Sequence, residues 1–354
     1  MQIAPFALER WFDEVEHDAD VMLAESGVRA LPANRFDTDP GELGYVIPTN
    51  GDPAFRTRVA ERHGRTADEV VFTCGAQEAN LLAFLALMGE HAVVVTPTYG
   101  SLSALPAALG EVTTVPLDPP TWSLDADDVA DAIRPDTAVV VVNNPNNPTG
   151  KHHDETTIRA VYDVCADNGT YLLCDEVYRL LADEPLPPVA SFGRYGVSTS
   201  SVSKAFGLAG LRFGWLCASP AVVAAATNWK DYTTISPGIF GQHIARQALD
   251  RADELLAESR ELAAEHRRIV ASFVDEYDLE WYEPDCGVNA FIRVPSGFAS
   301  GESFCRSVVA EESVVLAPGD AFGHPDRFRL GYGLARDELD DGLDRLGSFL
   351  DRHG

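Results

Sequence analysis

The sequence contains little lysine and methionine, and it has no long apolar run. Three of its 27 basic residues are lysines, and three residues are methionine. No apolar stretch approaches the roughly 20 residues that span a bilayer, and the first 20 residues lack a basic-then-apolar targeting pattern. We therefore expect a soluble cytoplasmic protein without a membrane segment.

Paired cysteines are also absent. The six cysteines form no C-x-x-C pair and show no zinc-ligand spacing. Because free cysteine is usually buried and a reducing cytosol keeps thiols reduced, we expect buried thiols, no disulfide and no metal site.

Positive charge is scarce as well: 27 basic residues face 55 acidic ones, a net charge of −28. Nucleic-acid binding needs clustered Lys and Arg, so we expect no nucleic-acid partner. An acidic, lysine-poor surface fits a cytoplasm of very high salt, where a Debye length of about 3 Å at 1 M screens self-repulsion. The composition therefore predicts a halophilic source.

The middle of the chain alternates β-rich runs with helical stretches. Near-continuous apolar strands between helices predict a mostly parallel sheet covered on both faces. Residues 239–277 read as one long helix or two, and the tail from about residue 278 fits a small α+β unit. The seven β-rich runs are 68–75, 91–99, 111–117, 137–144, 170–178, 196–203 and 212–219.

Open α/β sheets bind ligands at the carboxyl ends of their strands. Five residues with useful chemistry fall at those ends: Gly75, Tyr99, Asn147, Asp175 and Lys204. We therefore expect one ligand site at this edge of the sheet.

Lys204 stands in SVSKAFGLAGLRFGW (201–215), among serines and glycines. A lysine amine that loses its proton can form a Schiff base with a carbonyl group; the alternative is an exposed lysine on a loop. Ser201 and Arg212 could together bind a phosphate. The glycines lack the dinucleotide-binding spacing, and TGK (149–151) is not a P-loop.

Other polar residues suit a flat, charged ligand. Asp175 ends an apolar run, where a carboxylate needs a partner: it either caps a helix or pairs with an arginine, or it faces a protonated ring nitrogen. Asn147, in the turn NNPNNPTG, could donate to a phenolate-like oxygen, and Tyr178 could face the same ligand. Tyr99 could stack on a ring, and CGAQEA (74–79) opens a helix whose free N–H groups favour an anion. Together these groups predict a pocket for pyridoxal 5'-phosphate.

Several motifs carry a family resemblance. The chain resembles the class I/II aminotransferases, pyridoxal-phosphate enzymes of fold type I, over roughly residues 40–345. The resemblance implies an α/β fold with a mostly parallel seven-stranded sheet. It further implies an N-terminal segment (1–40) packing on the small domain, a large cofactor-binding domain (41–275) and a small C-terminal α+β domain (276–354). The motifs are SVSKAFGLAGLRFGW, DEVY (175–178), NNPTG (146–150), CGAQEA, PTY (97–99), PGDAFG (318–323) and FRLGYG (328–333).

The same resemblance implies residue roles. Lys204 would form the Schiff base and move the substrate proton, and Asp175 would pair with the ring nitrogen. Arg329 would bind the substrate α-carboxylate, its alternative being a surface ion pair. The remaining cofactor contacts would be Asn147 and Tyr178 on the ring oxygen, with Asn147 also near the substrate, Tyr99 on the ring, and Ser201, Arg212 and the backbone of Ala76 and Gln77 on the phosphate.

The implied activity moves an amino group between an amino acid and a 2-oxo acid in a homodimer, with Tyr45 reaching the partner's phosphate site. LAESGVRAL (23–31) and KDYTTISPG (230–238) are similar to a subgroup that includes capreomycidine-synthase-like proteins, which act on an arginine derivative. The loop 35–42 would offer carboxylates to a cationic side chain, or be acidic surface. A lyase, decarboxylase or cyclase on the same scaffold, and a non-catalytic cofactor-binding regulator, are the alternatives.

Overall fold

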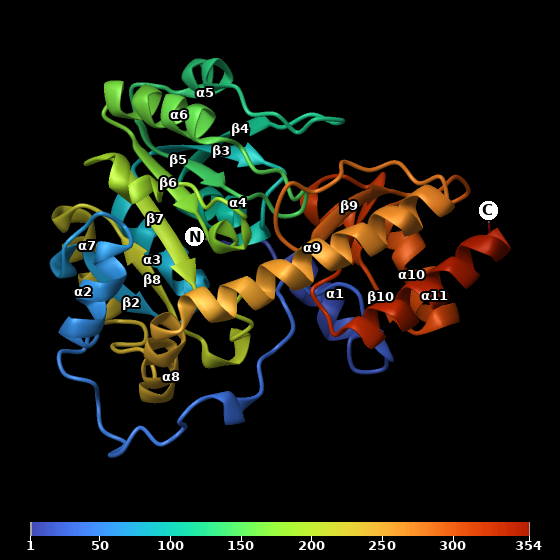
Figure 1. The fold of residues 1–354 in the computed structure, drawn as a ribbon. Helices are drawn as coiled ribbons and strands as arrows, with labels where there is room; N and C mark the ends of the chain where they lie inside the picture. The colour runs from blue at the N-terminus through green and yellow to red at the C-terminus, as the bar shows by residue number, and fades with distance from the viewer. Residues whose placement is uncertain (1, 354) are drawn as a thin grey trace.

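A seven-stranded sheet forms the larger part of the computed structural model, which describes residues 2–353 (Figure 1). Its strand order is β2-β8-β7-β6-β5-β3-β4, and only β8 runs antiparallel to its neighbours. All seven predicted strands and the mostly parallel sheet are therefore confirmed. The strands are β2 (Val70–Thr73), β3 (His91–Thr96), β4 (Glu111–Pro116), β5 (Thr137–Asn143), β6 (Tyr171–Asp175), β7 (Gly196–Ser201) and β8 (Gly214–Cys217).

Helices cover both faces of this sheet. On one face, Leu82, Leu102 and Val222 come from three helices and join a buried cluster with the strands. On the other face, Val59 and Ile158 pack on the strands in the main core. The first set comprises α3 (Gly75–Leu87), α4 (Gly100–Leu109) and α7 (Pro220–Lys230), and the second α2 (Pro53–Glu61), α5 (Ala126–Ala132) and α6 (Glu155–Asp167). This doubly covered sheet explains why its strands read as continuous apolar runs.

The stretch 239–277 forms two helices, α8 (Ile239–Asp250) and α9 (Ala252–Glu276), separated at Arg251. The 25 residues of α9 correspond to about 37 Å of helix. In Figure 1, α9 runs from the seven-stranded sheet to the C-terminal elements. It therefore links the two parts of the molecule.

The C-terminal elements surround a small antiparallel sheet of order β11-β12-β9. It consists of β9 (Asn289–Arg293), β11 (Ala317–Pro318) and β12 (Arg327–Gly331), with α10 (Gly301–Glu312) and α11 (Arg336–His353) beside it.

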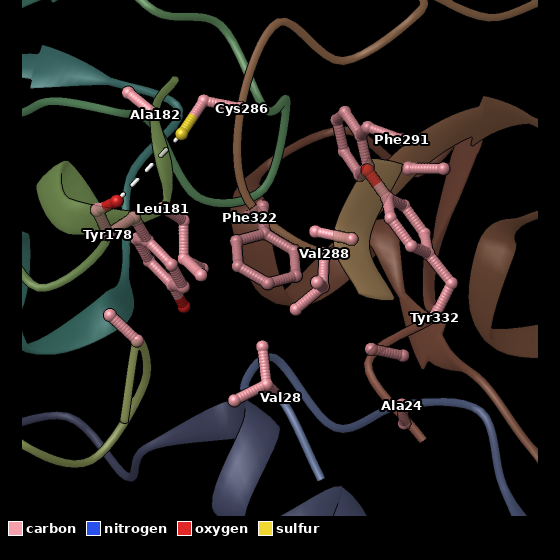
Figure 2. Close-up of a cluster of buried hydrophobic side chains, with 14 of the residues drawn as sticks. Ala24, Val28, Tyr178, Leu181, Ala182, Cys286, Val288, Phe291, Phe322 and Tyr332 are labelled. Carbon is pink, nitrogen blue, oxygen red and sulfur yellow. Dashed lines mark hydrogen bonds between the residues drawn. The ribbon is translucent and has the colours of Figure 1, made fainter. Parts of the chain in front are cut away.

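The N-terminal segment packs on these C-terminal elements. Strand β1 (Val21–Met22) pairs in parallel with β10 (Val314–Val315), and Trp11 of α1 (Ala7–Val15) donates through Nε1 to the Leu316 carbonyl at 2.8 Å. Figure 2 shows Ala24 and Val28 of this segment in the same apolar cluster as Phe322. The domain boundaries at residues 40 and 275 stay predictions.

All six cysteines are free thiols, and five of them are buried. Within residues 2–353, no cluster of His, Cys, Asp and Glu could hold a metal ion, and no helix is long and apolar enough to cross a membrane.

Candidate functional site

The polar side chains of the site lie on the same strands and the same face of the sheet as buried apolar side chains. Leu173 and Val197 lie in the apolar cluster beneath α3, and two residues further along the same strands stand Asp175 and Thr199. Because strand side chains alternate between faces, both polar groups point to the α3 side. Glu176 falls on the other face. The strand pattern thus changes from apolar to polar at the carboxyl edge.

A cavity of about 360 Å³ opens at this edge, within the range of small-molecule sites. It is lined by every predicted site residue except Tyr45: Ala76, Gln77, Tyr99, Asn147, Asp175, Tyr178, Ser201, Lys204, Arg212 and Arg329. One pocket therefore collects groups that are spread over some 250 positions of sequence.

Lys204 follows β7 and is half-buried in this cavity. Its Nζ donates to Ser26 Oγ at 2.9 Å, and the Lys204 carbonyl accepts from the Val28 backbone N–H. The exposed-loop alternative is therefore wrong. Gly207 has a φ of +62°, and a Cβ there would overlap the Arg29 carbonyl, which explains the glycine after the lysine.

Ser26 was missed by the sequence reasoning. It is only 8% exposed and lines the cavity. Its motif LAESG was noted only as a family likeness, and no local pattern indicates that this serine meets a lysine 178 positions later.

Asp175 is a buried carboxylate held by two hydrogen bonds. Asn80 Nδ2 donates to Oδ2 at 2.8 Å, and the Val177 N–H donates to Oδ1 at 3.2 Å. Burial raises the pKa of Asp175 to about 6, although these hydrogen bonds and the charge of Lys204 lower it. No Arg or Lys of the described chain forms a salt bridge with it, so the arginine-pair alternative is wrong. Asn80 was also missed by the sequence reasoning.

Arg329 of β12 is 1% exposed, and its alternative as a surface ion pair is wrong. Nη1 donates to Asn147 Oδ1 at 2.9 Å and Nη2 to the Ala24 carbonyl at 2.6 Å. Nε is buried without a hydrogen-bond partner within residues 2–353, and burial lowers the pKa of this guanidinium. A buried cation that contacts only neutral oxygens is a suitable partner for a ligand carboxylate.

Asn147 is tied to the sheet through Asn143. The Asn147 N–H donates to Asn143 Oδ1 at 2.7 Å, and Asn143 Nδ2 donates to the Asp175 carbonyl at 3.0 Å. Since Asn147 Oδ1 is occupied by Arg329, its amide N–H groups are the part suited to a ring oxygen. These bonds connect the Arg329 end of the cavity to the Asp175 end.

The start of α3 and Arg212 form a further part of the cavity wall, apart from Arg329 and Asp175. Gly75 has a φ of +76°, and a Cβ there would lie 2.5 Å from Arg212 Nη2. The first-turn N–H groups of Ala76 and Gln77, the buried Ser201 and this guanidinium all border the cavity. Helix N-termini and arginine both favour phosphate.

The two tyrosines of the cavity come from different elements. Tyr99 precedes α4, its ring lies edge-on to Phe6 at 5.0 Å between centroids, and its hydroxyl donates to Glu9 Oε1 at 3.4 Å. Burial raises the pKa of Tyr99. Tyr178 is 3% exposed and stands at the edge of the apolar cluster in Figure 2.

Tyr45 is not at this site within the single chain. It is 70% exposed and lies in the stretch 36–52, which has no helix or strand. The nearby loop 35–42 does not line the cavity either: Arg35 pairs with Glu258 at 2.6 Å, and Asp37 N–H donates to the Gln247 side chain. Within one chain this loop is therefore no source of carboxylates for the site. Tyr45 as a partner-site residue stays a prediction.

The residues present fit pyridoxal phosphate. Asp175 is a buried carboxylate without a salt-bridge partner in the described chain, which suits a protonated ring nitrogen. Gly75 leaves space beside Arg212 that a Cβ would fill, as a phosphate cradle requires. Lys204 lies in the same cavity with its amine held by a neutral hydroxyl.

Comparisons with known proteins agree with this geometry. Residues 18–346 match the family described as aminotransferase class I and II. Capreomycidine synthase of Streptomyces vinaceus is 32% identical over 98% of this chain and 94% of that protein. A probable aspartate/prephenate aminotransferase of Thermus aquaticus is 28% identical, covering 98% of this chain and 91% of its own length.

Solved structures are similar over the full chain. A PLP-dependent aminotransferase from Streptococcus suis 89-1591 has a TM-score of 0.94 at 28% identity, covering 100% of this chain and 99% of that one. The PLP-dependent cyclase OrfR has a TM-score of 0.90 at 29% identity with the same coverage.

Proposed function

The chain belongs to the class I and II aminotransferases, pyridoxal-phosphate-dependent enzymes of fold type I, and we propose how its residues transfer an amino group between an amino acid and a 2-oxo acid. The observation that carries the assignment of roles is the single cavity that brings together Lys204, Asp175 and Arg329. The bound cofactor supplies an electron sink for the substrate Cα and carries the amino group between the two half-reactions.

The roles of the three residues follow from their surroundings. Lys204 is the residue that would hold the cofactor covalently through Nζ, and its amine would move the proton at the substrate Cα, with Ser26 Oγ orienting the free amine. Asp175 would hold the proton on the ring nitrogen, since an ionised carboxylate in a buried site favours a cation beside it. Arg329 binds the substrate α-carboxylate, and Asn147 fixes the guanidinium in place.

The other lining residues hold and enclose the cofactor. Arg212, Ser201 and the first turn of α3 would bind the phosphate, and Tyr99 would cover the ring and exclude water; all of them line the cavity. Asn147 and Tyr178 donate to the ring oxygen.

Absorption spectroscopy tests this assignment. Wild-type protein reconstituted with pyridoxal phosphate should turn yellow, lose this band with an amino acid and regain it with a 2-oxo acid. Lys204→Ala should show no amino transfer. Lys151→Ala is the matched control, because Lys151 lies outside the cavity and contacts Tyr282 and Asp285. Turnover by Lys204→Ala equal to wild type would contradict the assignment.

A second candidate is another reaction on the same scaffold, such as cyclisation of a cationic amino acid. The likeness to capreomycidine synthase and to a PLP-dependent cyclase favours it, as do Glu9 and Glu16 of the α1 region, which line the cavity. Amino acids with acidic, aromatic and cationic side chains, tested with and without 2-oxo acid, separate the candidates. Conversion that needs no oxo acid indicates a lyase, decarboxylase or cyclase, and ligand binding without conversion indicates a regulator.

We further propose a homodimer in which Tyr45 reaches the partner's phosphate site. Three apolar residues of one loop support this, since Leu43, Tyr45 and Ile47 are each at least 70% exposed. Sedimentation equilibrium should give twice the chain mass. Tyr45→Phe should weaken cofactor binding, and a monomer with full activity would contradict the proposal.

We also propose that the enzyme works in the cytoplasm of a halophile, as its net charge of −28 suggests. Its unfolding midpoint should rise with KCl concentration up to molar levels, and a salt-independent midpoint would contradict this.

The domain division at about residues 40 and 275 is supported by the separation of the seven-stranded sheet from the three-stranded sheet, with α9 running between them. Limited proteolysis, with cleavage near these positions, tests it.

A further inference from the structure

We propose that Asn80, held by Thr199, is a positioning residue that fixes the Asp175 carboxylate in its ionised form facing the cofactor ring. This inference rests on the proposed role of Asp175. Nothing in the motifs or the family likeness identified Asn80 or Thr199.

The contacts link one helix to two strands. Asn80, in the second turn of α3, is 1% exposed and lines the cavity. Its Nδ2 donates to Asp175 Oδ2 at 2.8 Å, and its Oδ1 accepts from Thr199 Oγ1 at 2.6 Å. Asp175 and Thr199 are direct partners in the β6–β7 register, so their side chains stand on the same face.

The chemistry of these three groups selects one orientation of the amide. An ionised carboxylate accepts hydrogen bonds and donates none, so it requires the NH₂ group of Asn80. The amide oxygen then faces Thr199, whose hydroxyl proton it accepts. Reversing the amide would place its oxygen against a carboxylate oxygen. It would also leave the Thr199 hydroxyl proton without an acceptor within residues 2–353. The arrangement therefore favours a charged Asp175.

The remaining ionisable groups near Asp175 do not replace this contact. Lys204, after β7, favours the ionised carboxylate, but its amine is engaged in covalent chemistry during turnover. Tyr99, just before α4, Cys174 on β6, and Glu176 directly after β6 carry no positive charge. Asn80 is consequently the side-chain donor that holds the carboxylate throughout the reaction.

The test compares Asn80→Leu, which removes both amide groups at similar size, with Thr199→Val and Thr199→Ser. A hydrogen bond to a charged group corresponds to a factor of about 10 to 100. We expect Asn80→Leu to lower kcat by that factor and to raise the cofactor dissociation constant, with a smaller change in the substrate KM. Thr199→Val should show part of the same loss in kcat and cofactor affinity. Thr199→Ser, which keeps the hydroxyl, should have the wild-type values.

Two readouts separate positioning from general damage. The pH at which the bound cofactor changes its absorption should shift in Asn80→Leu and Thr199→Val relative to wild type. Ser198→Ala is the matched control, because Ser198 is the adjacent buried hydroxyl of β7 but donates to Glu176 on the other face. It should leave the spectrum unchanged.

The outcomes distinguish this inference from the proposed function. If Asp175→Asn lowers kcat but Asn80→Leu and Thr199→Val keep wild-type kcat, spectrum and cofactor affinity, the positioning role is overturned. If Asp175→Asn itself has wild-type activity, the assigned role of Asp175 fails first. Should Asn80→Leu not fold, Thr199→Val against Thr199→Ser decides by the same measurements.

Discussion

Asp175→Asn should make the stability of the cofactor-free protein less sensitive to pH. In the folded protein burial raises the pKa of Asp175 to about 6, against an ordinary value of 3.8. The unfolded chain therefore releases this proton at lower pH than the native chain does. Between these two values the native state binds more protons, so the free energy of unfolding decreases as pH rises.

The magnitude follows from the difference of the two pKa values. About 2.2 units correspond to about 3 kcal/mol of stability lost by the wild type once the pH is above 6. About half of this loss falls between pH 5 and pH 7.5. The variant has no carboxyl group at this position, so the loss is absent from it. Its missing hydrogen-bond acceptor adds only an offset that does not vary with pH.

Urea unfolding at constant high salt, followed by the fluorescence of the five tryptophans, measures the effect. The informative quantity is the free energy of unfolding of the wild type minus that of the variant at each pH. Glu176, whose pKa burial raises to about 7, titrates in both proteins. The charge of Asp175 also raises this pKa, so Glu176 titrates at a lower pH in the variant, and this adds to the expected decrease of the difference. Saturating cofactor should abolish the decrease, because a protonated ring nitrogen then pairs with the carboxylate.

Without cofactor, the difference should decrease from pH 5 and level off toward pH 7.5. A flat difference would show that Asp175 has an ordinary pKa in the folded protein. A difference that increases with pH would show that a cation already pairs with it, and either result would refute the reasoning.

Three further changes test other parts of the site. Arg329→Lys should raise the KM for amino acids about 10- to 100-fold, because an ammonium does not match the two oxygens of a carboxylate. Cofactor affinity should stay unchanged. An unchanged KM in steady-state kinetics would show that the substrate α-carboxylate binds elsewhere. Gly75→Ala should raise the cofactor dissociation constant at least about tenfold, since its Cβ would lie 2.5 Å from Arg212 Nη2. If fluorescence titration gives the wild-type dissociation constant, the phosphate does not bind at this position. Glu78→Gln should lower the free energy of unfolding, measured with urea, by about 3–5 kcal/mol. The reason is that Lys230, which is 1% exposed, would lose its carboxylate partner. A loss below about 1 kcal/mol would exclude a structural role for this ion pair.

The sequence alone was sufficient to predict the seven strands and the edge at which the site forms. Each strand lies between covering helices, so its apolar run is continuous and easily recognised. The residues that follow these runs collect at one edge because parallel strands end together. For this reason Lys204, Asp175 and Asn147 were found from the strand pattern, and Arg329 from its motif near the C-terminus.

The break between α8 and α9 was harder to predict from the sequence. Residues 239–277 keep a helical composition throughout, and the interruption at Arg251 has no proline or glycine to mark it. Arg251 donates to the Arg35 carbonyl at 2.9 Å, a contact with a distant segment. No local pattern in the chain encodes that contact.

The tertiary structure alone decided which side chains act on the predicted ones. Ser26 meets Lys204 and Asn80 meets Asp175 across separations of 178 and 95 residues, through single hydrogen bonds. A hydrogen bond depends on atomic positions within a few tenths of an ångström, whereas strand and helix patterns depend only on the periodic burial of side chains. The sequence therefore determined the sheet, its ligand edge and the family, and the packing of α3 and residues 23–28 against that edge determined how Asp175 and Lys204 are held.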